Sequence, residues 1–238
     1  MIHKMIKKFL FAIGICAVVV ACSPEKKGAM VVEGTIKGLK KGTVYLQKFQ
    51  DTTMVVVDSI FVSGKENYRL AYDLKEPQLF FLSIDKNGQQ QIEFFGEAST
   101  IKVNTRLDKF VTKATIEGSS HQDLLDEYKE MIDQFSEKRL DLIKQSFDAR
   151  TADNDSLAAV LDKRSESLVK NRYRYTASFA IKNGDNEVAP YLALTELYDA
   201  HISLLDTVNN SLSERIKQSK YGVQLENFVK DIREAEKE

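Results

Sequence analysis

Histidine, the side chain most often used as a general base, is scarce in this 238-residue chain. The three histidines are His3, His121 and His201. His121 follows two serines at the expected start of a helix, and His201 lies within another predicted helix, so we expect both imidazoles to be solvated or loosely packed. No Gly-X-Ser-X-Gly elbow accompanies them, and two histidines on separate elements make a poor zinc site. The histidines therefore predict neither a catalytic triad nor a metal centre.

The acidic residues offer two further kinds of site. Asp153-Asn154-Asp155 is similar to the start of a calcium loop, but Ala158 stands where the loop needs Gly and Arg164 where it needs Glu. Helix capping explains these acids better. A pair of carboxylates for glycoside hydrolysis is available by number, since 35 acids are present, but no pair is singled out. The absence of Trp also removes the usual platform for sugar rings.

The densest mixture of cationic and aromatic residues is residues 171–175, Asn-Arg-Tyr-Arg-Tyr. On a helix Arg172 and Arg174 point about 200° apart, so they form no single basic strip. We expect Tyr175 to pack while the arginines extend to solvent or pair with acids. The whole chain carries 34 basic and 35 acidic side chains, and this balance excludes a protein whose task is to coat nucleic acid, so we expect no nucleic-acid partner. We expect no cofactor and no catalytic residue.

The beginning of the chain is typical of an export signal. Lys4, Lys7 and Lys8 precede an apolar run over residues 9–20, which is shorter than the roughly 20 residues that a membrane span needs. The run ends in Val-Val-Ala-Cys at residues 19–22, which resembles a bacterial lipobox. The resemblance implies a signal peptide over residues 1–21 and lipidation of Cys22 with fatty-acyl chains such as palmitate. It also implies attachment to the membrane through that lipid, and Ser23 in place of Asp favours the outer membrane.

Lipidation would account for both cysteines. Cys16 leaves with the signal peptide and Cys22 is acylated, so no disulfide or cysteine nucleophile remains. The mature chain would keep 31 basic and 35 acidic side chains, a net charge of −4. Two alternatives stay open, an ordinary cleaved signal with an incidental Cys and an uncleaved N-terminal anchor.

After a linker over residues 22–30, residues 31–118 alternate apolar and polar side chains with period two. This pattern predicts eight strands, at residues 31–36, 43–47, 55–61, 68–72, 79–84, 91–95, 100–104 and 111–117. Asn87-Gly88 is typical of a tight hairpin. We predict a meandering antiparallel β-sandwich or open barrel.

From residue 119 to residue 238 the period becomes 3.6, which predicts a helical domain. Ser119 or Ser120 caps a first helix, and Asp155 caps a second that ends at Asn183-Gly184. The stripe of the first helix comprises Leu124, Tyr128, Met131, Phe135 and Leu142, and that of the second comprises Leu157, Leu161, Leu168, Tyr175 and Phe179. These two should form an antiparallel hairpin. A third helix begins near Pro190 and carries Leu194, Leu197 and Leu204, followed by two shorter pieces. The fold class is therefore α+β, with a long helical hairpin.

Several segments of the predicted β domain carry a family resemblance. They are residues 32–39 (VEGTIKGL), 42–46 (GTVYL), 57–62 (VDSIFV), 76–82 (EPQLFFL), 94–95 (FF) and 116–119 (IEGS). Together they resemble the uncharacterised N-terminal β domain of Gram-negative envelope lipoproteins of the thioredoxin-like, thiol:disulfide interchange type, over residues 31–135. In many relatives a thioredoxin-like domain with Cys-X-X-Cys follows. No residue here matches that motif, so the resemblance implies no redox activity for this chain.

We therefore expect a non-catalytic lipoprotein of a Gram-negative cell envelope that acts as a binding or scaffold module for an envelope partner. One alternative is an accessory protein of an envelope thiol–disulfide system, and another is a carboxylate-based hydrolase. If Phe80-Phe81 and Phe94-Phe95 each turn one ring outward, a docking surface on the sheet results, unless the helices cover it.

Overall fold

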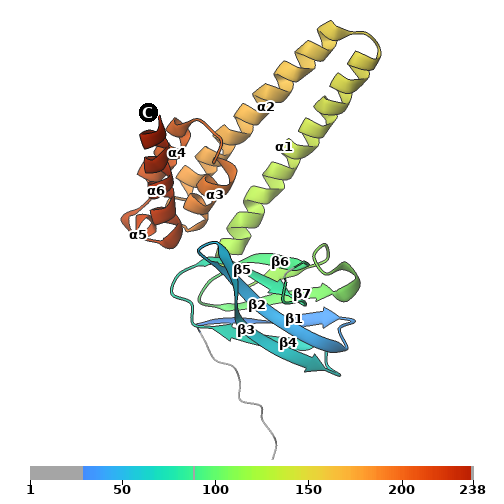
Figure 1. The fold of residues 1–238 in the computed structure, drawn as a ribbon, viewed down its shortest axis with the longest axis vertical. Helices are drawn as coiled ribbons and strands as arrows, with labels where there is room; N and C mark the ends of the chain where they lie inside the picture. The colour runs from blue at the N-terminus through green and yellow to red at the C-terminus, as the bar shows by residue number, and fades with distance from the viewer. Residues whose placement is uncertain (1–28, 88, 237–238) are drawn as a thin grey trace, which may run out of the picture.

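A β-sandwich and a group of helices with one projecting hairpin make up the protein (Figure 1). The computed structural model describes residues 29–87 and 89–236. The first sheet has the strand order β4-β1-β7-β8, and the second has the order β3-β2-β5-β6. The strands of the first sheet are β1 (Met30–Lys37), β4 (Asn67–Tyr72), β7 (Thr100–Arg106) and β8 (Thr115–Glu117). Those of the second are β2 (Lys41–Gln50), β3 (Thr53–Ser63), β5 (Gln78–Ser83) and β6 (Gln91–Gly96).

The period-two alternation of the strands produces the core of the sandwich. Ile101 and Val103 of β7 and Leu70 of β4 point inward from one sheet, and Phe80 of β5 meets Phe94 of β6 in the other. All five are completely buried. The prediction of an α+β fold with an N-terminal sandwich is confirmed.

Two details of the β domain differ from the expectation. β1 pairs in parallel with β7, so the strands do not form a simple antiparallel meander. The last predicted strand was also too long, because residues 107–114 form a 3₁₀ turn (Leu107–Lys109) and a further turn before β8 begins at Thr115. Phe110 is buried at the end of the sandwich, and its carbonyl accepts a hydrogen bond from the Thr105 hydroxyl at 2.6 Å. Gly88 of the predicted hairpin lies outside the described residues, although β5 and β6 on either side of it pair antiparallel.

The predicted hairpin is formed by α1 (Ser120–Thr151) and α2 (Asp155–Lys182). The Ser119 hydroxyl accepts from the Gln122 N–H at 3.1 Å and so caps α1, whereas Asn154, one residue before the expected Asp155, caps α2. With 32 residues at a rise of about 1.5 Å, α1 extends over roughly 48 Å. Its tip lies far from the sandwich (Figure 1).

Four further helices follow α2. They are α3 (Val188–Glu196), α4 (Ile202–Ser211), α5 (Glu214–Lys217) and α6 (Lys220–Ala235). Of these, α3 and α4 pack directly on α2, and α6 packs on α3 and α4. Their shared core includes Ala180, Leu205 and Leu225, all fully buried. The single third helix predicted from Pro190 to Leu204 is two helices, because the chain turns at residues 197–201. Within the described residues, no helix combines the length and the apolar character needed to cross a bilayer.

The helices cover the outer face of the second sheet at β5 and β6. Phe80 and Phe94 point into the sandwich, while Phe95 points outward and is buried against Leu125 and Tyr128 of α1. Two hydrogen bonds join the parts across this junction: the Phe95 N–H donates to Gln122 Oε1 at 2.8 Å, and the Leu79 N–H donates to the Tyr221 hydroxyl at 3.1 Å. The part of the sheet face around Phe95 is thus a junction between the two halves, whereas Phe61 of β3 stays 60% exposed.

Candidate functional site

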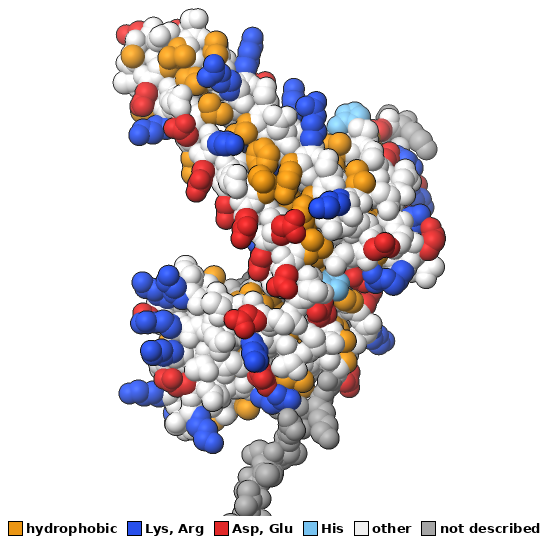
Figure 2. Space-filling model, turned by 180° about the vertical axis from the view of Figure 1, so that it is seen from behind, with side chains coloured by type: hydrophobic (Ala, Val, Ile, Leu, Met, Phe, Trp, Pro, Cys, Tyr) orange, Lys and Arg blue, Asp and Glu red, His pale blue; other side chains and the backbone are white. Residues whose placement is uncertain are grey.

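The outer half of the hairpin leaves large apolar side chains uncovered. On α1, Leu140, Ile143 and Phe147 have 67%, 50% and 67% of their surface exposed. Their spacing of three and then four residues puts them on one face of the helix. We call these three residues the α1 stripe. The local core that holds the two helices together here is small, consisting of Ala149, Ala158 and Leu161 with the partly buried Leu142. Figure 2 shows apolar side chains along the hairpin, interspersed with charged ones.

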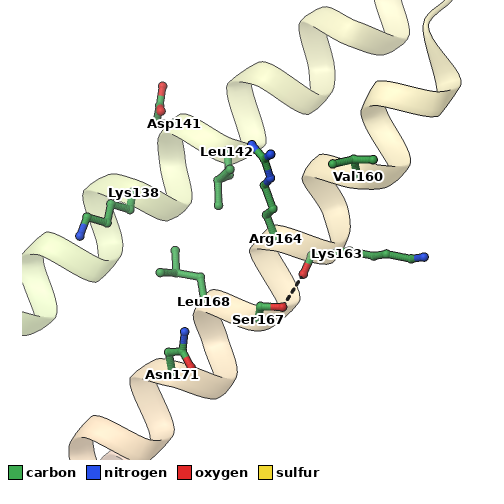
Figure 3. A pocket seen from close by; sticks show the side chains of 9 residues that line it. All are labelled: Lys138, Asp141, Leu142, Val160, Lys163, Arg164, Ser167, Leu168 and Asn171. Carbon is green, nitrogen blue, oxygen red and sulfur yellow. Dashed lines mark hydrogen bonds between the residues drawn. The ribbon is translucent and has the colours of Figure 1, made fainter.

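A groove runs between α1 and α2 on a different face from the α1 stripe (Figure 3). It is largely open to solvent and has a volume of about 550 Å³. Leu142 and Leu168 point into the space between the helices, and Val160 continues this apolar lining. The remaining lining residues are polar or charged: Lys138, Asp141, Lys163, Arg164, Ser167 and Asn171.

The charges around this groove are mostly positive. Arg164 extends from α2 toward α1, Lys138 lies on α1, and the Lys163 side chain extends from α2 away from α1 (Figure 3). Among the described residues none of these three cations forms an ion pair. The one lining acid, Asp141, accepts a hydrogen bond from the Gln145 side chain at 2.7 Å. The groove therefore combines an apolar lining with cationic groups that have no acidic partner within the part of the chain that the structure describes.

A second cavity of about 380 Å³ adjoins the groove at Leu168. Arg172 lines it, forms an ion pair with Glu196 at 2.9 Å and lies over the Tyr173 ring at 5.2 Å. Tyr175 packs in the junction core. The interpretation of residues 171–175 as packing and pairing residues is confirmed.

His121 departs most from its expected environment. The prediction of a solvated imidazole was wrong, because only 13% of the side chain is exposed. Nδ1 contacts Glu97 in the β6–β7 loop, and Nε2 lies 2.8 Å from Glu187 immediately before α3. The ring also stacks on Phe95 at 5.5 Å between centroids. We call His121, Glu97 and Glu187, together with Arg215 of α5, which contacts Glu187 at 2.5 Å, the histidine clamp.

The clamp consists of mutually stabilised charges. Burial by itself would lower the pKa of His121, but hydrogen bonds to Glu187 and Glu97 outweigh it, and the pKa is raised. Burial would raise the pKa of Glu97, yet hydrogen bonds from Ser120 and His121 lower it. The pKa of Glu187 is likewise lowered against the effect of burial, by hydrogen bonds from His121 and Arg215 among others. Both ring nitrogens have carboxylate partners, so the arrangement joins the sandwich, α1, α3 and α5 and leaves neither nitrogen free for a substrate.

The other candidate residues from the sequence, His201 and Asp153, lie at a helix start and in a turn. His201 is exposed, as expected, and its Nδ1 accepts from the Ser203 N–H at 3.2 Å at the start of α4. Asp153 lies in the turn between α1 and α2 with a φ of 52°. Across the described ranges, no group of three or more His, Cys, Asp or Glu residues is placed to hold a metal ion. Cys22 and the predicted signal peptide lie outside the described residues.

Two groups of residues were missed by the sequence analysis. Glu97 and Glu187 are 24 and 66 residues from His121, and no local pattern links them to it. The α1 stripe did leave a signal, because Leu140, Ile143 and Phe147 repeat at helical spacing on a face other than the predicted one.

Comparison with known proteins identifies the β domain. Residues 30–125 match the family model described as Domain of unknown function (DUF4369). The match covers all eight strands and the first residues of α1. It confirms the resemblance of the β domain to an uncharacterised family. No curated protein and no solved structure gives a significant match to this chain.

Proposed function

On the premise that residues 30–125 form a DUF4369 domain, we propose that the chain is a non-catalytic lipoprotein of a Gram-negative cell envelope. In this proposal the lipid on Cys22 tethers the chain to the outer membrane, and the helical hairpin holds a protein partner. The protein is then a binding module whose β domain and C-terminal helices form the base.

The uncovered apolar surface of the hairpin is the observation that carries this proposal. Contiguous exposed apolar surface on a protein commonly marks an interaction site. Here two separate apolar features, the α1 stripe and the groove between the helices, occupy the same projecting half of the hairpin. The sheet face around Phe95, by contrast, is already covered by the helices.

The surroundings of the acidic and imidazole groups support a role other than catalysis. A general base must reach the proton that it removes. His121 has a carboxylate on each ring nitrogen, and Glu187, with only 3% of its side chain exposed, also binds Arg215. A hydrolase that used Glu97 and Glu187 would have to break the clamp that joins the two halves of the protein.

Photocrosslinking in intact cells tests the proposal. A photoreactive phenylalanine analogue replaces Phe147 in the α1 stripe or Val160 in the groove, and the matched control position is Glu226, exposed on α6. We expect a protein adduct at position 147 or 160 and a much weaker one at 226. An absence of adducts at both hairpin positions, with the protein present at normal levels, would rule out the hairpin as the docking element.

The same experiment addresses the accessory role in a thiol–disulfide system. That alternative is supported by the resemblance of the β domain to domains fused to thioredoxin-like modules. Mass spectrometry of the adducts identifies the partner. A partner that carries a redox Cys-X-X-Cys would favour the accessory role, and partners without one would count against it.

A further inference from the structure

We infer that the groove between α1 and α2 binds an amphipathic helix with acidic flanks, supplied by the partner protein. This inference rests on the proposed function and specifies its partner. The groove itself comprises an apolar lining from both helices and cations at its edges.

The dimensions of the groove fit a helix. Its α2 side runs from Val160 to Asn171, which at about 1.5 Å per residue is roughly 16 Å, or three helical turns. A helix of that length presents apolar anchors at positions i, i+3 or i+4, and i+7. Leu142, Val160 and Leu168 supply apolar surface along this distance for such anchors.

The positive charges at the groove favour a helix that has acidic residues beside its apolar anchors. Lys138, Lys163 and Arg164 form no ion pair among the described residues, and the groove contains a single acid, Asp141, already bonded to Gln145. Arg139 in the adjoining cavity adds a further cation without an ion pair in the described part. Potentials that complement each other across an interface favour one partner and exclude like-charged ones. Glu or Asp beside the apolar anchors would pair with these cations.

A second copy of the chain fits this groove less well. Two copies that paired groove to groove would bring the cations of both together, and such like-charge contacts oppose association. An amphipathic helix with acidic flanks complements both the apolar lining and the cations of the groove.

Binding of two synthetic helical peptides tests this inference. Both have 18 residues and the same Leu positions, and one has Glu flanks whereas the other has Lys flanks. The full-length lipidated protein is held in lipid nanodiscs, and affinity is measured by fluorescence anisotropy at low salt. We expect the Glu-flanked peptide to bind at least tenfold more tightly, with a difference that shrinks as salt rises because the cations are partly solvated.

Charge reversal in the groove provides the matched comparison. Lys138→Glu together with Arg164→Glu should weaken binding of the Glu-flanked peptide at least tenfold. The control, Lys109→Glu with Lys113→Glu, makes the same change of net charge at exposed positions of the β domain and should leave the affinity within twofold. Circular dichroism checks that each variant keeps its helices.

The outcomes separate this inference from the proposed function. Equal binding of the two peptides, or tighter binding of the Lys-flanked one, overturns the inference that the bound helix has acidic flanks. Failure of both peptides to bind while position 160 crosslinks to a partner leaves the docking role intact and also overturns the inference. An adduct at position 160 that consists of a second copy of the chain or of lipid likewise overturns the inference of a partner helix. Selective binding that is lost on charge reversal supports it.

Discussion

Replacing His121 by Leu tests whether the histidine clamp stabilises the protein through charge. The change removes both contacts of the imidazole, one to Glu97 and one to Glu187, while leaving an apolar side chain of similar size against Phe95. A hydrogen bond to a charged group contributes about 1.5–3 kcal/mol. Glu97 keeps Ser120 as a partner and Glu187 keeps Arg215, which moderates the loss. We expect the free energy of unfolding to fall by about 3 kcal/mol at pH 5.5.

The pH dependence follows from the directions of the pKa shifts. The pKa of His121 is raised on folding, so its contribution is complete below the unfolded value of 6.5 and is lost as pH rises through the folded pKa. The pKa values of Glu97 and Glu187 are lowered, so their contributions are complete above the unfolded value of 4.5 and are lost as pH falls through their folded pKa values. The clamp should therefore stabilise most between pH 4.5 and 6.5.

Urea unfolding of the wild-type and variant proteins at pH 5.5 and pH 9 measures this difference. Neutral imidazole carries one N–H, so one of the two bonds to carboxylates is lost at high pH. The cost of His121→Leu should then drop to about half, roughly 1.5 kcal/mol. Circular dichroism and tyrosine fluorescence report unfolding, since the chain has no Trp. His201→Asn, which keeps a capping side chain at an exposed histidine, is the control and should change stability by less than about 0.5 kcal/mol. An equal cost of His121→Leu at both pH values would refute the charged clamp.

Three further changes test other parts of the structure and the proposal. Tyr128→Phe removes a buried hydroxyl that lies 2.8 Å from Thr176 Oγ1, and should cost about 1 kcal/mol in urea unfolding; no loss would mean that the bond contributes nothing. Gly222→Ala places a Cβ 1.9 Å from the carbonyl oxygen of Ile216 and should lower the melting temperature by several degrees, and an unchanged melting temperature would contradict the close packing there. Cys22→Ala should move the protein from the membrane to the soluble fraction, with Cys16→Ala as the control; a membrane-bound Cys22→Ala variant would rule out the lipid anchor.

Local patterns in the sequence were sufficient for most of the fold. Strands such as β5 and β7 follow from alternation, because one face of each points into the sandwich. The start of α1 follows from Ser119, whereas the cap of α2 was predicted one residue late, at Asp155 in place of Asn154. The parallel pairing of β1 with β7 could not be predicted in this way, because alternation is the same for either strand direction. The eighth strand was predicted too long because residues 111–114 alternate without being paired in a sheet.

The candidate site was harder to predict than the fold. The environment of His121 depends on Glu97 and Glu187, which approach it only when the helices dock on the sheet. His121, which follows two serines, was expected to be exposed, because nothing near it in the sequence indicates that Phe95 covers its imidazole ring. The groove was missed for the same reason. Leu142 and Leu168 were assigned to the seam of the hairpin, and only the geometry of the two helices leaves them half-buried beside cations that form no ion pair with any described residue.

The two ends of the hairpin differ in how they are held, and this difference links stability to the proposed binding. Near the sandwich, Leu125, Tyr128 and Phe179 join a large aromatic core that the histidine clamp reinforces. Toward the tip, the buried cluster consists of only three residues, Ala149, Ala158 and Leu161. Burial of apolar area stabilises by about 25 cal/mol per Å², so two alanines and one leucine contribute little there. A partner helix in the groove would bury Val160 and Leu168 as well, and so would stabilise the half of the hairpin that it binds. Ligand binding to the folded state alone raises stability by mass action, so selective protection of the outer hairpin from hydrogen exchange should accompany binding of the acidic peptide.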